Sequence, residues 1–388
     1  MLVALPALVN PATKIPRTTL WCGAFLLMAS LSAIASGLSP FVFLDYSFYR
    51  YDGNAFISLL PFLLLPAIKG HRLPLRIGLE LTVSSIAVVL LSSEILAPEL
   101  LFNSHNALGG VISVVLLVNI SLLDRRYMFY PLILNIAALH MSDSRGSAIG
   151  LIAALVTLSL VERGRKKMAA WFAGLLVVGS LLLAVVGHHV WRQIGSPEVL
   201  DIDNFSSAIE TLGQSGGEGI ESVSSIGSRG STISHRVFFI WPVAVEDFLS
   251  SPMVGIGFSR FDDRPTHLEG IPGLIARNDS PNIHHSDLHA HHSFLHVAAE
   301  TGLVGLSIIV AFLVSIWRAS ESLEPIWRRM VRYLLLYAIY SSCTEHRLFT
   351  PAQMLPAAAI MALVITYAGG DQRVRGFLAD QRREPAQR

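Results

Sequence analysis

HHSDLHAHHSFLHVAAETGLVG, from His284 to Gly305, is the stretch that decides the fold. Six histidines lie between His284 and His296, and the sequence then continues as an apolar run through Trp317. An ionisable cluster that leads directly into a hydrophobic span places reactive groups at a membrane surface. A helix that begins near His291 would bring together on one face His291, Leu295, Ala298, Gly302 and Gly305. Because small residues let helices approach closely in membranes, we expect His291 to lie above a seam between helices.

Composition indicates a membrane protein with many helices. The chain has 388 residues, of which 52% are hydrophobic and only 15% are charged, and its mean hydropathy is +0.53. The formal net charge of +1 argues against a nucleic-acid partner, which would require a concentrated basic face. Cys22 and Cys343 lie in apolar runs, so neither a disulfide framework nor a cysteine-based metal site is expected. Met1 to Arg17 shows no clear small-residue cleavage site, so we expect no removed signal peptide.

The apolar runs predict an all-α fold, a polytopic transmembrane helix bundle of about ten spans with one large extracytoplasmic loop. The predicted spans are Thr19–Leu38, Asn54–Ile68, Leu75–Ala97, Ala107–Leu123, Tyr127–Met141, Gly146–Val161, Ala169–Gly187, Ser293–Trp317, Val331–Thr344 and Pro351–Tyr367. They divide the chain into N-terminal transmembrane helices (1–187), the large loop with an amphipathic helix (188–292), C-terminal transmembrane helices (293–368) and a cytoplasmic tail (369–388).

The distribution of Lys and Arg predicts the orientation. With ten spans, every short basic loop falls on one side, which the positive-inside rule makes cytoplasmic together with both termini. The region from His188 to His292 is then extracytoplasmic, as are the short turns Asp143–Arg145 and Glu345–Thr350.

The large loop has parts of different character. Asn204 to Ser234 is rich in Ser and Gly, which predicts a mobile flap or lid. His235 to Leu249 is apolar enough for a helix at the bilayer surface or against the bundle. Gly255-Ile256-Gly257-Phe258 predicts a tight turn after that helix.

The histidine cluster allows three interpretations. It could be a solvated polar lip before a membrane helix. It could also bind a metal through His289, His291 and Asp287, although the spacing matches no specific metal motif. The third interpretation is a single general base, for which imidazole is suited because it titrates near neutral pH.

Cationic side chains at the predicted outer surface suggest a phosphate-bearing substrate. Arg145 opens a predicted span and Arg236 precedes the apolar helix of the loop. Each could instead be an interfacial or solvated arginine, but a guanidinium matches phosphate with paired donors, and two of them near a membrane lip suit a lipid-linked pyrophosphate. Arg260, His292 and the turn Glu345-His346-Arg347 are further candidates for substrate binding. Mutual ion pairing within that turn is the default expectation for Glu345, His346 and Arg347.

Three stretches together resemble the O-antigen ligase/polymerase family of bacterial membrane glycosyltransferases. They are Ser142-Asp143-Ser144-Arg145-Gly146-Ser147-Ala148; Arg236 to Trp241 followed by Pro252-Met253-Val254-Gly255-Ile256-Gly257-Phe258; and His291-His292-Ser293-Phe294-Leu295 followed by Glu300-Thr301-Gly302-Leu303-Val304-Gly305. They are similar to that family's Ser-Arg-Gly helix start, its arginine-tryptophan helix with Pro-x-x-Gly-x-Gly, and its His-Asn-x-x-Leu signature with Glu-x-Gly-x-x-Gly. His292 stands where the family usually has Asn, and about ten spans stand where twelve are common.

The resemblance implies a GT-C-like, metal-independent, inverting glycosyltransferase without cofactor. It also implies a location in the bacterial inner (plasma) membrane, with the active site facing the periplasm or exterior. The donor would be an undecaprenyl-pyrophosphate-linked glycan, and the acceptor a lipid- or glycan-linked hydroxyl, as in an O-antigen ligase or an O-antigen or exopolysaccharide polymerase; membrane lipid would surround the chain. The resemblance gives His291 the role of base and Arg236 and Arg145 the role of holding pyrophosphate. A transporter, or a non-catalytic scaffold of envelope polysaccharide export, is the alternative, although transporters usually place ionisable residues near the bilayer midplane.

Overall fold

The computed structural model describes residues 15–36, 54–67, 75–96, 105–142, 144–194, 236–261 and 289–383. Every regular element in these residues is helical, which confirms the all-α prediction. In chain order the helices are α2 (Arg17–Ala35), α4 (Asn54–Leu64), η1 (Leu65–Ala67), α5 (Leu75–Leu96), α6 (His105–Ser121), η2 (Arg126–Met128), α7 (Phe129–Met141), α8 (Arg145–Glu162), α9 (Lys166–Ile194), η4 (Arg236–Ile240), α12 (Trp241–Ser250), α14 (Ser293–Ser320), α15 (Pro325–Ser341) and α16 (Pro351–Arg383).

Each predicted span coincides with a helix, because a long apolar run satisfies its backbone in lipid most simply as a helix. Among the described residues, five helices are long and apolar enough to cross a membrane: α2, α5, α8, α9 and α14. α4, α6 and α16 contain shorter apolar stretches, so the total of about ten crossings stays a prediction. α16 continues as a helix to Arg383, through most of the segment expected to be a tail. Asn204–Ser234, the expected flap, lies outside the described residues.

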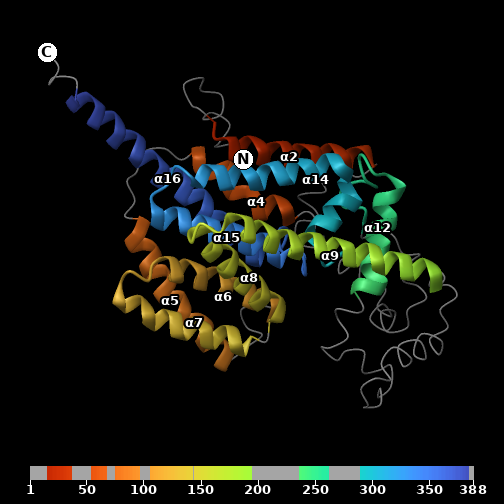
Figure 1. Cartoon of the computed structure of the whole chain (residues 1–388), viewed down its shortest axis with the longest axis horizontal. Helices are drawn as coiled ribbons and strands as arrows, with labels where there is room; N and C mark the ends of the chain where they lie inside the picture. Colours follow the sequence, from red (N-terminus) through yellow and green to blue (C-terminus); the bar gives the residue numbers. More distant parts are fainter. Residues whose placement is uncertain are drawn as a thin grey trace.

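The bundle is organised by pairs of helices that are distant in sequence. α14 packs along α2, α15 along α8, and α16 against α4 and α6, and Figure 1 shows α2 and α14 side by side. Gly150 allows α8 to approach α15 closely, because an added Cβ would lie 3.1 Å from the Cβ of Ser341 on α15. Two turns further along α8, the hydroxyls of Thr157 and Tyr340 are hydrogen bonded at 2.7 Å.

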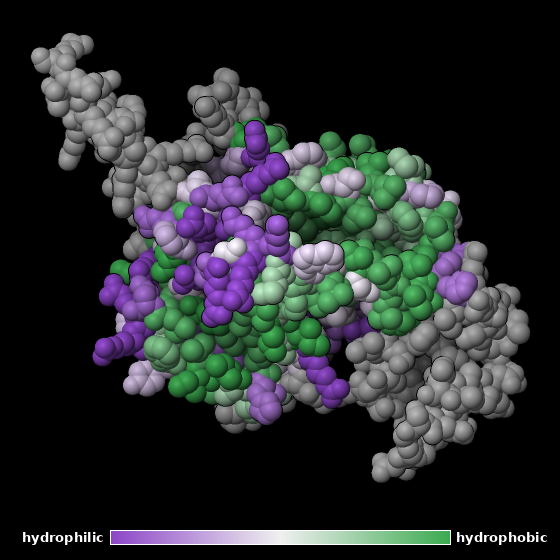
Figure 2. All heavy atoms as spheres, in the orientation of Figure 1, coloured by the Kyte–Doolittle hydropathy of each residue, from purple (hydrophilic) through white to green (hydrophobic). Residues whose placement is uncertain are grey.

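Aromatic side chains fill the centre of the bundle. Phe25 stacks on Phe349 with ring centroids 5.7 Å apart, and Phe62 meets Phe312 edge to face at 5.0 Å. These pairs join α2 to the turn before α16, and α4 to α14. The outward faces are also apolar, and Figure 2 shows hydrophobic side chains over much of the visible surface, as expected for helices that face lipid.

A second, smaller core lies at the end of the molecule where α14 begins. It joins α9, η4, α12 and the first turns of α14 through buried side chains that include Ala184, Val237, Trp241 and Leu295. The predicted loop helix of residues 235–249 is therefore present as η4 and α12, and it packs against α9 and α14. This packing places Arg236 beside the residues that precede α14.

Candidate functional site

α14 begins at Ser293, and the prediction that His291 belongs to this helix is wrong. His292 is the N-cap: its backbone is extended, and its Nδ1 accepts a hydrogen bond from the backbone N–H of Leu295 at 3.2 Å. His291 lies before the cap with φ 48°, in the left-handed region. The expected common face with Gly302 does not exist either, because Gly302 has φ 62° and ψ −162° and interrupts the helix.

That interruption accommodates the Gly-Ile-Gly segment that follows α12. Leu303 and Val304 donate their N–H groups to the carbonyl oxygens of Pro252 and Met253, at 2.8 and 3.2 Å. In return, the carbonyl oxygens of Ala299 and Glu300 accept from Ile256 and Gly257, both at 3.0 Å. Two helical hydrogen bonds are thus replaced by four bonds to an inserted segment, so both donors and both acceptors of the lost helical bonds are paired.

Two glycines make this insertion possible. Gly255 has φ 72°, and an added Cβ would lie 2.1 Å from the backbone carbon of Glu300. Gly302 has φ 62°, and its Cβ would lie 2.3 Å from the backbone carbon of Met253. Both the left-handed backbone and the space exclude a side chain. The Pro-x-x-Gly-x-Gly and Glu-x-Gly motifs are therefore the two halves of one structural unit, and the tight turn predicted at Gly255–Phe258 is confirmed.

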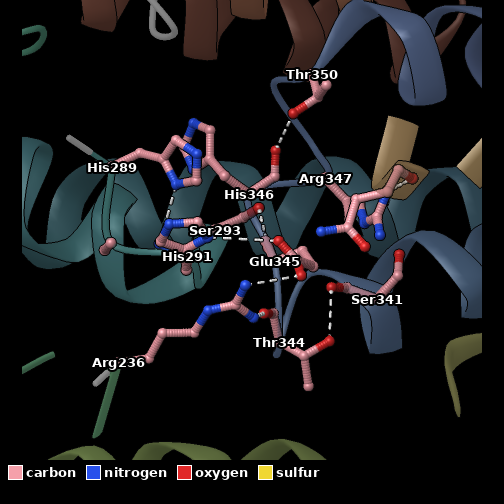
Figure 3. Close-up of polar contacts among 12 residues, drawn as sticks. Arg236, His289, His291, Ser293, Ser341, Thr344, Glu345, His346, Arg347 and Thr350 are labelled. Atoms are coloured by element: carbon pink, nitrogen blue, oxygen red, sulfur yellow. Dashed lines mark hydrogen bonds and ion pairs between the residues drawn. The ribbon is translucent and has the colours of Figure 1, made fainter. Parts of the chain in front are cut away.

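Glu345 connects the polar residues near the start of α14. Its Oε1 lies 3.0 Å from the Nη2 of Arg236, and its Oε2 lies 3.4 Å from the Nδ1 of His291. Arg236 also donates through Nη1 to the carbonyl oxygen of Thr344 at 2.6 Å. Figure 3 shows Arg236 and His291 converging on Glu345 from two different segments. Residues more than fifty positions apart in sequence thus meet at one carboxylate.

Charge explains how this carboxylate stays ionised although it is nearly buried. Burial raises the pKa of Glu345, but the hydrogen bond with His291 and the charges of Arg236 and Arg347 outweigh it, and the pKa is lowered to about 2. Burial lowers the pKa of His291 from its usual value, only partly opposed by Glu345. A neutral His291 that donates from Nδ1 to Glu345 leaves Nε2 as an acceptor.

A cluster of imidazoles extends from His291 into the bundle. The rings of His289 and His291 are 4.0 Å apart, and the Nδ1 of His289 accepts the backbone N–H of His291 at 3.1 Å. His346 stacks on His289 at 4.9 Å and meets His296 edge to face at 4.5 Å. Burial lowers the pKa of His289 well below its usual value, and the neighbouring histidines and Arg236 lower it further. His346 is thus a buried member of the cluster, in contact with the rings of His289 and His296.

Two other predicted arginines, Arg145 and Arg347, differ in their exposure. Arg145 is exposed on the first turn of α8, and a Cβ at the neighbouring Gly146 would lie 3.4 Å from the Cγ of Glu345. Arg347 is buried and donates to the carbonyl oxygen of Asn106 at 2.7 Å and to the Oγ of Ser147 at 3.1 Å. The ion pair of Glu345 is therefore with Arg236, and the expectation of pairing within the turn is wrong.

Two further candidates face away from Glu345. The Nε2 of His292 lies 3.1 Å from the hydroxyl of Ser180 on α9, its ring meets Trp241 edge to face at 5.5 Å, and burial lowers its pKa to about 4. Arg260 donates to the carbonyl oxygen of Ser36 at the end of α2. His292 thus performs the capping that Asn performs well, since both side chains offer an acceptor to the first turn.

Sequence reasoning missed two features of this region. His296 and Glu300 form a fully buried pair on α14, with Nε2 and Oε2 3.5 Å apart, and Oε1 of Glu300 accepts the backbone N–H of Phe261 at 3.1 Å. Ser293 ties α14 to the turn before α16, because its N–H donates to the carbonyl oxygen of Ser342 at 2.8 Å. The signal for the pair was the i, i+4 spacing of an imidazole and a carboxylate in an apolar run.

The metal interpretation of the cluster involves His289, His291 and Asp287. Asp287 lies outside the described residues. Within the described ranges, no three His, Cys, Asp or Glu side chains are arranged as ligands of one ion.

One comparison with known proteins supports the resemblance to the O-antigen ligase/polymerase family. A family model described as O-antigen ligase matches residues 130–310. No curated protein matches the chain. The matched region contains Arg145, Arg236, both interlocked glycine motifs and His291, whereas Glu345 lies beyond it. The resemblance to the O-antigen ligase/polymerase family is confirmed, and with the apolar helices it supports a multi-pass membrane protein with a role in glycan transfer.

Proposed function

Because residues 130–310 match the O-antigen ligase family, we propose that the chain is a membrane glycosyltransferase that moves a glycan from undecaprenyl pyrophosphate to an acceptor hydroxyl during surface polysaccharide assembly. The observation that carries the proposal is the contact of Glu345 with both Arg236 and His291. That contact joins a cation suited to phosphate with a neutral imidazole suited to a hydroxyl proton. Both are needed when an alcohol displaces a diphosphate from a sugar.

Arg236 serves the donor. Its contacts with Glu345 and Thr344 use two of the five N–H groups of a guanidinium, so three donors remain for phosphate oxygens. Arg145, exposed on the first turn of α8 and adjacent in sequence to Gly146, which approaches Glu345, supplies a second cation. Positive charge at this place stabilises the diphosphate as the bond between the anomeric carbon and the phosphate oxygen breaks and the leaving group takes the electron pair.

His291 serves the acceptor. Its pKa is lowered by burial, so the ring is neutral at pH 7. With Nδ1 donating to Glu345, the free Nε2 takes the proton of the acceptor hydroxyl as its oxygen bonds to the anomeric carbon. One direct displacement of this kind inverts the configuration at that carbon. No metal is needed, because the diphosphate is already an activated leaving group.

Glu345 is a positioning residue in this scheme. Its Oε2 fixes the tautomer and the orientation of His291, and its Oε1 holds Arg236. The left-handed backbone of His291 serves the same end, because it turns the side chain out of the α14 helix and toward the turn before α16. The site faces the periplasm, and the acceptor is a lipid- or glycan-linked hydroxyl, as in a ligase or a polymerase.

The proposal is tested by transfer in proteoliposomes. The full-length chain is reconstituted with an undecaprenyl-pyrophosphate-linked glycan and an acceptor, and products are identified by mass spectrometry and the new linkage by NMR. His291→Ala and Arg236→Ala should reduce transfer by at least about a hundredfold, the size expected for loss of a general base or a charge-stabilising donor. His140→Ala, an exposed histidine on α7, is the matched control and should leave transfer unchanged.

Full transfer by His291→Ala at normal protein level would remove the base from the mechanism. Movement of the glycan across the membrane without any new glycosidic bond would favour a transporter. Intact surface polymer in cells whose chain carries both substitutions, His291→Ala and Arg236→Ala, would favour a scaffold. Loss of transfer on addition of a chelator, restored by zinc, would support the metal interpretation instead.

A further inference from the structure

α9 is the least buried of the five long apolar helices, and one of its faces carries a groove. Only 11% of its apolar stretch is buried, against 28% or more in the other four. The groove has a volume of about 560 Å³, and the residues that line it include Lys167, Trp171, Gly174, Leu175, Gly179 and Leu182. An added Cβ at either glycine would touch nothing within 4 Å, so the glycines leave a notch on the lipid-facing surface.

A second, basic cavity adjoins this groove at Lys167. It has a volume of about 650 Å³ and is lined by residues 164–168, which include Arg165, Lys166 and Lys167. These cations are exposed, and none of them forms an ion pair with an acidic side chain in the part of the chain that the structure describes. Glu162, the nearest acidic residue in sequence, pairs instead with Arg329 at 2.8 Å. Figure 2 shows hydrophilic side chains gathered where α9 begins and hydrophobic ones along it.

The two cavities together have the dimensions of a membrane lipid. From Lys167 to Leu182 the helix rises by about 22 Å, and one leaflet of the hydrocarbon core is about 15 Å thick. The groove therefore extends from the membrane surface through the depth of one leaflet. Trp171 lies one turn beyond Lys167, near the membrane–water interface, where tryptophan is enriched in membrane proteins.

We propose that this surface binds an anionic glycerophospholipid, with its phosphate among Arg165, Lys166 and Lys167 and one acyl chain in the groove. Charge complementarity identifies the occupant, because a neutral lipid would leave the three cations without a counter-charge. A second copy of the chain is disfavoured. A parallel contact along α9 would bring the two basic clusters together, and like charges repel.

The headgroup half of the proposal is tested with purified full-length chain in a neutral detergent. Phosphatidylglycerol or phosphatidylcholine is titrated in, and bound lipid is counted by native mass spectrometry. Lys166→Gln/Lys167→Gln should weaken phosphatidylglycerol binding about 25-fold, since each cation near an anionic headgroup contributes roughly a factor of five. Arg125→Gln/Arg126→Gln removes two exposed cations that line neither cavity, and it should change nothing.

The groove half has its own pair of variants. Gly174→Leu fills the notch and should weaken phosphatidylglycerol binding, whereas Gly78→Leu, at a similarly open glycine on α5, should not. Both changes replace glycine by a better helix former, so neither should unfold the chain. Equal binding of the two lipids by the wild-type chain, equal effects of variants and controls, or a dimer that Gly174→Leu abolishes would each overturn the proposal.

Discussion

Replacing Glu345 by Gln keeps the size and shape of the side chain and removes its charge. The pKa of Glu345 falls from 4.5 to about 2 in the folded chain, because the hydrogen bond with His291 and two arginine charges outweigh burial. One pKa unit corresponds to about 1.4 kcal/mol, so ionised Glu345 stabilises the folded chain by about 3 kcal/mol at pH 7. Loss of one partner from a buried ion pair has a similar cost in other proteins.

The pH dependence follows from the sign of this shift. Since the pKa is lower in the folded chain, the stabilisation is complete above pH 4.5 and is lost as the pH falls toward 2. At pH 3 the wild-type chain should therefore exceed Glu345→Gln by only about 1.4 kcal/mol. The wild-type chain and Glu345→Gln are compared by unfolding in mixed micelles between pH 3 and 8, with helix content followed by circular dichroism.

Glu162→Gln is the control, because it breaks an ion pair of similar length in a different environment. Arg329 and Glu162 lie 2.8 Å apart, but both side chains are more than 40% exposed, so the loss should be below about 1 kcal/mol. Burial, and not distance, decides the difference between the two pairs. Equal costs for the two variants, or a cost for Glu345→Gln that does not change with pH, would refute this reasoning.

Three further outcomes are expected. Gly302→Ala should lower the free energy of unfolding by about 2 kcal/mol or more, because the backbone of Gly302 is left-handed and abuts Met253. Gly174→Ala, at a helical position where an added Cβ meets nothing, should stabilise the chain slightly, and chemical unfolding compares the two variants. His292→Asn should keep the fold, since Asn can also cap α14, while Leu there should cost about 1 kcal/mol by the same measurement. Transfer should persist below pH 6.5, because burial lowers the pKa of His291, and Glu345→Gln should move the acidic limb of the kcat/KM profile to still lower pH.

The helices could be predicted from sequence because the signal for them is local. An apolar run long enough to cross lipid has one stable backbone conformation, so each predicted span coincides with a helix. The start of α14 could not be predicted in the same way. A histidine that accepts a hydrogen bond as an N-cap is indistinguishable in sequence from a histidine within the first turn, and only the extended backbone of His292 shows which it is.

The interruption at Gly302 could not be predicted because its cause is not local. The glycine pattern is visible in the sequence, but the segment that enters α14 precedes it by about fifty residues. The partners of the candidate residues could not be predicted for the same reason, because a sequence shows the type of each side chain but not its long-range contacts. The resemblance assigned Arg236 and His291 roles in one reaction. That Glu345 joins them, while Arg347 binds the backbone of α6, depends on how α15 and α16 are packed.

These contacts divide the site into two parts. Arg236 and His291 belong to one unit, because η4 and α12 lead directly into the segment that is inserted at Gly302 of α14. Glu345 belongs to the other, on the turn between α15 and α16, which Ser293 ties to the start of α14 through the hydrogen bond from its N–H to the carbonyl oxygen of Ser342. Ser293 ties the two units together, and among the described residues the carboxylate of Glu345 contacts both the base and the cation. The relative orientation of His291 and Arg236 is therefore set by a group that neither motif contains, and a match to both motifs alone does not establish a competent site.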